Sequence, residues 1–249
     1  ACARNNELNK ATALLDSMES RGLSPDLHVY SAVITACANT SNWSAALDTF
    51  DTLKANGLEP DLAIYNGVIS ALAAGGPWEK AVGTLDSMFA KGLVPTNWHY
   101  TSAIQACGRQ GQWKKALGLL DEMVIMNVPA DVKVYTAIMR ALRESEEWEI
   151  ALDLFAGLEE KNITPDVRCC NEAIVICSRA GKWERAMEIL ESMARQWNLQ
   201  PSYLTYSRAI LACAKSDRWE LAVGLLKSMV FQGLSPDKGS FKIAIGACF

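Results

Sequence analysis

Histidine is scarce in this sequence, and neither sign of charge is in large excess. Only two histidines, His28 and His99, occur among the 249 residues. Ser-His-Asp and Cys-His catalytic sites need a histidine beside the nucleophile, so we predict that the protein is not an enzyme. The 24 lysines and arginines against 28 aspartates and glutamates give a net charge of −4. Composition alone therefore does not indicate a nucleic-acid-binding protein.

Long hydrophobic runs are also missing. Half of the residues are hydrophobic, which is enough for a core, but no stretch of about 18 apolar residues exists. We therefore predict no membrane span.

The sequence begins at Ala1 and shows no signal or transit peptide. We interpret it as a piece of a longer or processed protein whose targeting segment is not visible.

Three residue types return at one fixed interval along the chain. Tyr30, Tyr65, Tyr100 and Tyr135 are each 35 residues apart, and Cys170, Tyr206 and Phe241 hold the next places. A tryptophan keeps the same interval at Trp43, Trp78, Trp113, Trp148, Trp183 and Trp219, and an alanine follows each by three residues. Three markers with one period indicate a repeat architecture.

The markers divide the chain into a single array of repeats. The six full repeats are 27–61, 62–96, 97–131, 132–166, 167–202 and 203–237. A partial repeat, 1–26, precedes them, and another, 238–249, follows them. Solenoids normally carry capping repeats at their ends, so we expect the natural protein to continue on both sides.

Each repeat carries two helical patterns. In "VYTAIMRALRE" (134–144) and "EWEIALDLFAGLEE" (147–160) the apolar residues fall on one stripe of a helix. The second pattern ends near a residue that suits a left-handed C-cap, namely Gly57, Gly92, Asn127, Asn162 or Gly233. Two short helices cannot bury their apolar faces alone, so neighbouring hairpins are expected to stack into an all-α solenoid.

Two repeat families share this plan of helical hairpins. The tetratricopeptide repeat has a period of about 34 residues and a Trp-Leu-Gly-Tyr pattern in its first helix. That pattern is absent here, because the tryptophans open the second helix. The sequence instead resembles the pentatricopeptide repeat of the P-type class over essentially all its residues. "PDLAIYN" (60–66), "KKALGLLDEM" (114–123) and "ERAMEILESM" (184–193) carry the resemblance, which implies a right-handed α-solenoid superhelix of stacked hairpins.

The eight cysteines do not form a metal or disulfide pattern. Six of them share one repeat position, seven residues after the position that tyrosine usually occupies: Cys2, Cys37, Cys107, Cys177, Cys213 and Cys248. We interpret this cysteine position as a small buried packing site. Cys169 and Cys170 are adjacent and lack CxxC spacing. "AAGGP" (73–77) is interpreted as a turn between helices, and the recurring tryptophan as a packing residue that bridges hairpins. We expect no cofactor and no metal.

The resemblance implies single-stranded RNA as the ligand, with one base per repeat. In that family two side chains hydrogen-bond each base: the residue after the tyrosine and the last residue of the repeat. The pairs here are Ser31 with Asp61, Asn66 with Thr96, Thr101 with Asp131, Thr136 with Asp166, Asn171 with Ser202 and Ser207 with Asp237. Serine or threonine with aspartate implies guanine, and asparagine with serine or threonine implies a pyrimidine. The resulting prediction is 5′-G-Y-G-G-C-G-3′.

The aspartates have a second interpretation. Asp26, Asp61, Asp166 and Asp237 follow a proline and precede a helix, where an aspartate caps free N–H groups. Capping explains them whether or not RNA binds. It does not explain why every residue after the tyrosine place in the six full repeats is serine, threonine or asparagine, because these are only average helix formers. Both interpretations stay open at this point.

The resemblance also implies contacts that stack on bases and bind phosphates. The family holds each base between side chains at the second residue of successive repeats, and Trp98, Arg168 and Leu204 are the candidates here. A basic residue late in the first helix meets the phosphates. Arg109, Arg179 and Lys215 occupy that place, whereas other repeats have Asn39, Ala74 and Glu144 there.

Positive charge lies mainly in the later repeats. Residues 1–96 carry 6 basic against 10 acidic residues, and residues 97–249 carry 18 of each. Phosphate contacts supply much of the affinity for nucleic acid. We therefore predict RNA binding along residues 97–242 and contacts with a protein partner along residues 1–96.

Two functions are open. The first is an RNA-binding repeat protein of the chloroplast or mitochondrion that acts in transcript processing, stabilisation or translation. The second is a structural subunit that uses the solenoid to hold protein or ribosomal RNA in a large organellar complex, such as a ribosome or a photosynthetic or respiratory assembly. The serine, threonine, asparagine and aspartate set favours the first, and the acidic balance favours the second. Unpaired cysteines fit a reducing compartment.

Overall fold

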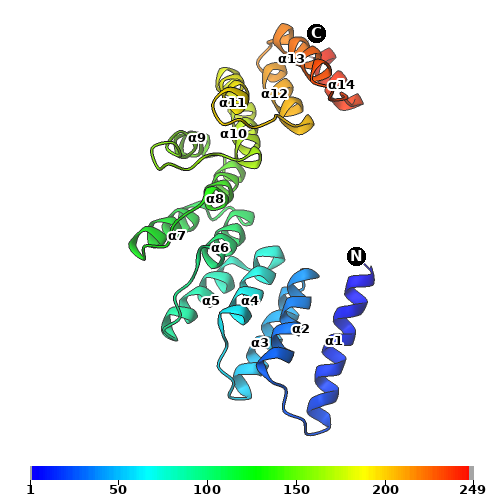
Figure 1. The fold of residues 1–249 in the computed structure, drawn as a ribbon, viewed down its shortest axis with the longest axis vertical. Helices are drawn as coiled ribbons and strands as arrows, with labels where there is room; N and C mark the ends of the chain where they lie inside the picture. The colour runs from blue at the N-terminus through cyan, green and yellow to red at the C-terminus, as the bar shows by residue number, and fades with distance from the viewer. Residues whose placement is uncertain (1, 247–249) are drawn as a thin grey trace. The chain divides into compact units, whose positions relative to one another are not determined.

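The computed structural model describes residues 2–246, the side chains of residues 2–7, 9, 16 and 19 excepted, and this range folds into helices without strands (Figure 1). The helices are α1 (Cys2–Ser20), α2 (Leu27–Asn39), α3 (Trp43–Ala55), α4 (Leu62–Gly75), α5 (Trp78–Ala90), α6 (Asn97–Arg109), α7 (Trp113–Ile125), α8 (Val132–Glu144), α9 (Trp148–Ala156), α10 (Val167–Arg179), α11 (Trp183–Arg195), α12 (Tyr203–Lys215), α13 (Trp219–Phe231) and α14 (Lys238–Gly246). They form two compact units, unit 1 (Ala1–Ala130) and unit 2 (Asp131–Phe249).

Each unit is a stack of helical hairpins. Unit 1 contains the hairpins α2–α3, α4–α5 and α6–α7, and unit 2 contains α8–α9, α10–α11 and α12–α13. The first helices of successive hairpins pack side by side within a unit, as α2 does on α4 and α10 does on α12. The second helices α3, α5, α9, α11 and α13 each pack on their own first helix and on the first helix that follows. This is the all-α solenoid that the sequence predicts.

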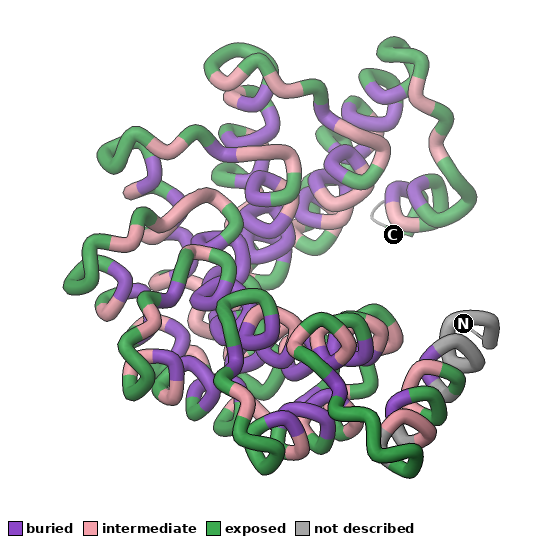
Figure 2. The backbone as a smooth tube through the Cα atoms, turned by 60° about the horizontal axis from the view of Figure 1, so that its bottom comes forward, coloured by how far each residue is buried: buried purple, intermediate pink, exposed green. Residues whose placement is uncertain are grey.

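The core of each unit lies between these two layers of helices, where the tube of Figure 2 is coloured as buried. The tyrosines of the 35-residue series, Tyr30, Tyr65, Tyr100, Tyr135 and Tyr206, expose at most 5% of their surface. The alanines of the second helices, Ala46, Ala81, Ala116, Ala151, Ala186 and Ala222, are fully buried. A small residue at that place lets the second helix approach the bulky tyrosine layer closely. None of the described helices is long and apolar enough to cross a bilayer.

The described cysteines are packing residues, as predicted. Cys37, Cys107, Cys169, Cys170, Cys177 and Cys213 are buried and form no disulfide. Burial raises the pKa of Cys37 to about 11 and that of Cys177 to about 12, so both thiols stay protonated. Thiols of this kind are inert. The described residues contain no group of three or more metal-ligating side chains, and the side chains of Cys2 and Cys248 lie outside the described part.

The junctions between repeats form helix caps on both sides. The carboxylates of Asp26, Asp61, Asp131 and Asp166 accept hydrogen bonds from backbone N–H groups in the first turn of the following helix. At the other end of the hairpins Gly57, Gly92, Asn127, Asn162 and Gly233 have φ angles between 54° and 76°. This left-handed conformation turns the chain so that the next N–H reaches back, as that of Leu58 does to the Leu53 carbonyl at 3.2 Å. The predicted capping role of these residues is confirmed.

The recurring tryptophans are less buried than the packing interpretation implies. Five are half-buried, and Trp219 is 47% exposed. They bridge hairpins at their edge instead of filling the core. Trp43 lies against the turn of the next hairpin, where a Cβ on Gly76 would come within 3.2 Å of its ring. The guanidinium of Arg218 lies 5.2 Å from the ring centre of Trp183. Only the end of the "AAGGP" segment is a turn: residues 73–75 belong to α4, and Gly76 and Pro77 connect it to α5. Gly75 and Gly76 leave room for the ring of Trp43.

The capping role of the aspartates is testable apart from any RNA. Asp166→Ala removes the acceptor of the Cys169 N–H, which lies 2.7 Å away, so we expect the free energy of unfolding to fall by about 1 kcal/mol. Asp166→Asn keeps an acceptor oxygen and should retain most of the stability. Urea denaturation measures both changes. The matched control is Asp121→Ala, which alters an exposed aspartate within α7. Equal losses in Asp166→Ala and the control would contradict the capping role.

Candidate nucleic-acid interface

The predicted contact residues occupy three places on the first helices. The last residue of each repeat is the N-cap of the following first helix, the second residue lies in the first turn, and the residue after the tyrosine lies one turn further on. The second residue is exposed in every described repeat, at His28, Ala63, Trp98, Lys133, Arg168, Leu204 and Gly239. A row of exposed side chains therefore follows the first helices of each unit.

Trp98 is the largest side chain in this row. It is 54% exposed, and its Nε1–H donates to Ser70 Oγ of the preceding hairpin at 3.3 Å. The bond fixes the ring while leaving much of its surface to solvent. Leu204, 46% exposed, and Arg168 are the other predicted stacking residues. An exposed aromatic ring, an apolar side chain and a guanidinium are the groups on which bases stack.

Two threonines of the predicted pairs use their hydroxyl hydrogens within the helix. The Oγ1–H of Thr136 donates to the Val132 carbonyl at 2.7 Å. Thr101 donates in the same way to the carbonyl of Asn97 at 2.8 Å. Both side chains are 8% exposed. Because each hydroxyl hydrogen is used within the helix, the lone pairs of Oγ1 are what remains for a ligand.

Two asparagines at the same place have unpaired oxygens. The Oδ1 atoms of Asn66 and Asn171 are buried and have no hydrogen-bond partner among the described residues. Most buried polar atoms in folded proteins are paired, and an unpaired one costs about 1–3 kcal/mol. Only two other side-chain atoms of the described part share this condition, Ser178 Oγ and Arg208 Nε. Half of the unpaired buried atoms thus lie where the sequence places base contacts.

The last residue of three repeats has a side-chain partner that the sequence analysis did not single out. Asp237 Oδ1 accepts from both the N–H and the Oγ–H of Ser240, at 2.7 and 2.8 Å. Ser202 Oγ lies 3.0 Å from Thr205 Oγ1. Each partner stands three residues after the cap, which is the spacing of a capping box. That spacing is the signal that could have revealed them.

At Thr96 the capping-box partner is a histidine. Its Oγ1 lies 2.8 Å from His99 Nδ1, which also accepts the Thr96 N–H at 3.0 Å. His99 is 3% exposed, and its Nε2 lies 3.4 Å from the Leu62 carbonyl. At the other junctions the third residue is Val29, Ile64, Val134 or Cys169, and the aspartate accepts backbone N–H groups alone.

One predicted pair is joined by hydrogen bonds. Ser207 Oγ lies 3.1 Å from Ser240 Oγ, which in turn donates to Asp237. The hydrogen bond from Tyr203, together with those from Ser240, holds the pKa of Asp237 below its usual value, so this carboxylate stays ionised. Thr101 and Asp131 belong to different units. None of the remaining pairs is directly hydrogen-bonded within the described part.

The predicted phosphate contacts differ in their surroundings. Arg179 and Lys215 are exposed at the ends of α10 and α12. The Nη2 of Arg109 instead donates to the Leu72 carbonyl at 2.9 Å. Arg109 therefore already stabilises the C-terminal end of α4, and a phosphate would compete with that carbonyl.

Comparisons with known proteins follow the same repeat pattern. The model of the pentatricopeptide repeat domain matches residues 13–75 and 153–216. Models of the same repeat match residues 98–144, and also 1–23, 63–93 and 204–234. No curated protein matches the chain.

Solved structures resemble the chain over most of its length. The pentatricopeptide repeat protein PPR10 from maize is 26% identical with a TM-score of 0.74, over 98% of this chain and 35% of the maize chain. PPR10 in complex with an 18-nt psaJ RNA element is 17% identical with a TM-score of 0.57, over 96% and 40%. The repeat domain of Arabidopsis thaliana protein-only RNase P 1 in complex with tRNA is 13% identical with a TM-score of 0.52, over 86% and 94%. The chain thus spans about a third of the maize protein.

The cap at His99 should make stability depend on pH. Burial lowers the pKa of His99 below 6.5, so the unfolded chain takes up a proton more readily than the folded one. The stability that the neutral ring contributes is present above about pH 6.5 and lost as the pH falls through the folded value. Urea denaturation between about pH 7.5 and 5.5 should show the free energy of unfolding decreasing.

Two variants isolate this effect. His99→Gln keeps an acceptor at the third position of the capping box and should remove most of the dependence. His28→Ala alters an exposed histidine and should retain it. An unchanged pH dependence in His99→Gln would show that another group is responsible.

Proposed function

Since the chain belongs to the pentatricopeptide repeat family, we propose that it binds single-stranded RNA along its first helices, one base per repeat. In this role it acts in the processing, stabilisation or translation of a transcript. His99 belongs to a helix cap, and the described cysteines are buried thiols. Both observations support a binding role over a catalytic one.

The unpaired oxygens of Asn66 and Asn171 carry the proposal. A pyrimidine offers an N–H donor on its Watson–Crick edge, at N4 of cytosine or N3 of uracil, and such a donor would satisfy a buried Oδ1. A base donor at each asparagine would therefore remove a cost that the free protein bears. Because purines also carry such donors, the preference of the two asparagines for pyrimidines rests on the family resemblance.

The threonines support guanine in the same terms. Thr136 presents the lone pairs of Oγ1. Its partner Asp166 uses Oδ1 to cap Cys169, which leaves Oδ2 as a further acceptor. Guanine carries two neighbouring N–H donors, at N1 and N2, on its Watson–Crick edge. Two acceptors facing two donors favour guanine, and the proposed order along the six repeats is 5′-G-Y-G-G-C-G-3′.

The relatives support RNA as the ligand class. The structure of maize PPR10 was solved with an RNA element, and that of the Arabidopsis RNase P repeat domain with tRNA. The family and the buried, unpaired cysteines support a reducing organelle, either chloroplast or mitochondrion. Residues 97–242 hold Arg179 and Lys215 exposed at helix ends, so we place the strongest RNA contacts there.

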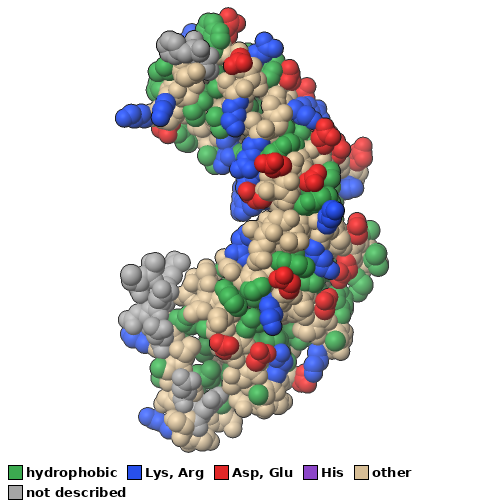
Figure 3. All heavy atoms as spheres, turned by 180° about the vertical axis from the view of Figure 1, so that it is seen from behind, with side chains coloured by type: hydrophobic (Ala, Val, Ile, Leu, Met, Phe, Trp, Pro, Cys, Tyr) green, Lys and Arg blue, Asp and Glu red, His purple; other side chains and the backbone are tan. Residues whose placement is uncertain are grey.

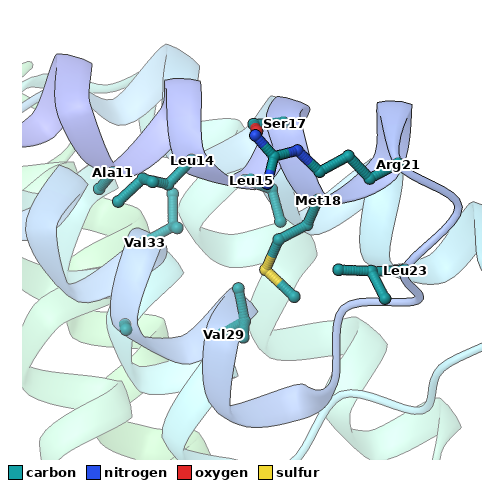
Figure 4. Close-up of a pocket in the computed structure, with 10 residues that line it drawn as sticks. Ala11, Leu14, Leu15, Ser17, Met18, Arg21, Leu23, Val29 and Val33 are labelled. Carbon is teal, nitrogen blue, oxygen red and sulfur yellow. The ribbon is translucent and has the colours of Figure 1, made fainter.

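A second candidate function is a protein contact along residues 1–96. Figure 4 shows Leu15 and Met18 of α1 directed toward Val29 and Val33 of α2, around an apolar pocket of about 430 Å³. Leu14, on its rim, is 67% exposed. An apolar groove between two helices suits the apolar face of a partner helix, and this pocket favours a scaffold role for residues 1–96.

RNA binding should depend on salt through the phosphate contacts. We expect the chain to bind an RNA that contains the proposed sequence more tightly than a scrambled one, with affinity falling as salt rises. Lys215→Ala should reduce the logarithmic salt slope by about 0.7, the value for one phosphate of a single strand. The control Lys227→Ala, on the second helix α13, should leave the slope unchanged. No binding and no salt slope in the unaltered chain would refute the proposal.

Base preference should follow the residue after the tyrosine. Thr136→Asn replaces an acceptor with an amide, so we expect selection from a random RNA pool to change the fourth base from guanine to a pyrimidine. The same chemical change at Thr52, on the second helix α3, serves as the control and should select the original sequence. If Thr136→Asn also selects the original sequence, the residue does not contact a base.

A further inference from the structure

Two departures from the regular repeat meet in unit 2. The second helix α9 has nine residues, whereas α3, α5, α7, α11 and α13 each have 13. The turn after α11 is one residue longer than its equivalents. There the N–H of Leu199 reaches back six residues to the Met193 carbonyl, while that of Leu234 reaches back five residues to Met229. Trp197 lies in the longer turn.

The short helix and the long turn are joined by hydrogen bonds. Gly157 is the C-cap of α9, and beyond it the chain forms a tighter turn, in which the N–H of Leu158 donates to a carbonyl three residues back. Glu159 lies in this tighter turn and is exposed. Its Oε1 accepts from Gln196 Nε2 at 2.7 Å and from Trp197 Nε1 at 3.2 Å. One carboxylate oxygen therefore holds the two irregular segments together.

These segments border a pocket of about 210 Å³ between α9 and α11. Leu152, Phe155 and Ile189 form its apolar walls, and each is at most 9% exposed. The ring of Trp197 makes a T-shaped contact with that of Phe155, with 5.9 Å between the ring centres. Trp197 is half-buried, so part of its indole remains open to a ligand. Small-molecule sites usually measure roughly 300–1,000 Å³, and this smaller pocket suits one inserted side chain.

The charge at the pocket is negative. Glu188 pairs with Arg185 at 2.8 Å, whereas Glu159 is held by neutral donors, and its Oε2 has no hydrogen-bond partner among the described residues. Residues 144–160, which include α9, contain seven acidic residues and no basic one. In Figure 3, acidic side chains lie close together on the part of the surface that belongs to unit 2. Such a surface repels a phosphate backbone and attracts a cationic side chain.

We propose that this pocket binds an arginine side chain from a basic segment of a partner protein. The guanidinium pairs with Oε2 of Glu159 and stacks on the indole of Trp197, and its methylene stem packs against Phe155. Arginine combines a planar cation with an apolar stem, which matches a carboxylate placed beside aromatic walls. The pocket lies on the second helices, whereas the proposed RNA contacts lie on the first helices. The proposal therefore does not depend on RNA binding.

Peptide binding tests the pocket directly. A fluorescently labelled peptide of glycine and serine that carries several arginines should bind the full chain saturably in an anisotropy titration. Binding should be weaker when lysines replace the arginines and absent when glutamines do. The indole N–H signal of Trp197, identified in NMR spectra by its loss in Trp197→Phe, should shift as the arginine peptide binds. Equal affinity for the arginine and lysine peptides, or binding without that shift, would overturn the site.

Variants separate the pocket from general attraction to acidic residues. Glu159→Gln keeps an acceptor for Gln196 and Trp197 but removes the charge, so it should bind the arginine peptide about tenfold more weakly. Trp197→Leu should weaken binding about threefold through the lost stacking. The matched control is Glu160→Gln, which alters an exposed neighbour outside the pocket and should retain the affinity. Equal losses in Glu159→Gln and Glu160→Gln would contradict the proposal. Circular dichroism and urea denaturation establish that each variant is folded.

RNA affinity distinguishes this surface from the proposed RNA contacts. Glu159→Gln and Trp197→Leu should bind the RNA as tightly as the unaltered chain does. A loss of RNA affinity in Trp197→Leu would assign the pocket to nucleic acid and overturn the protein partner. If no RNA binds the unaltered chain, the proposed function fails, while saturable binding of the arginine peptide through Glu159 would still support the pocket.

Discussion

Hydrophobic contact between successive hairpins holds each unit together, and the positions of all other groups depend on it. A single pair of short helices leaves an apolar face exposed, so each hairpin is stable only where a neighbour covers that face. The buried tyrosines and the fully buried alanines of the second helices are the repeated parts of this contact. Because they face the interior, the opposite side of the first helices is left to polar residues. The candidate interface is therefore a consequence of the packing as well as of the residues that form it.

The junction between repeats serves two purposes with one side chain. Asp166 caps α10 through Oδ1, and its second oxygen is not needed for the cap. Capping and base recognition, which are alternatives from the sequence, are thus compatible in the structure. The threonines are similar, because the hydroxyl hydrogen of Thr136 bonds the helix backbone and its oxygen keeps lone pairs that can accept. Asn66 and Asn171 have buried oxygens without such an internal partner, which is why they bear most directly on RNA binding.

Most of the fold was predictable because its signals are local and repeated. The interval of the tyrosines, the left-handed residues such as Gly57, and the aspartates before each first helix depend on a few neighbouring residues. The burial of Cys37 and Cys107 followed from their place in the repeat. The tryptophans were harder, because a ring at the start of a helix packs on the next hairpin and its burial depends on the turn there, as at Gly76.

The features of the interface that escaped prediction join residues of different hairpins. Glu172 binds Arg143 across α8 and α10, and Arg109 donates to the carbonyl of Leu72 on α4. Neither contact has a signature in the local sequence, since each depends on the distance between stacked helices. The histidine that caps Thr96 was a missed local signal, because capping boxes usually carry glutamate or glutamine at its position. The base contacts themselves stay a prediction.

The most direct measurement is a structure of the chain bound to RNA containing 5′-GYGGCG-3′. The account predicts that Oδ1 of Asn171, unpaired in the free protein, accepts a hydrogen bond of about 2.9 Å from N4 of the fifth base, a cytosine. It also predicts that Asn66 bonds the second base in the same way. RNA held on another surface, with both oxygens still unpaired, would contradict the account.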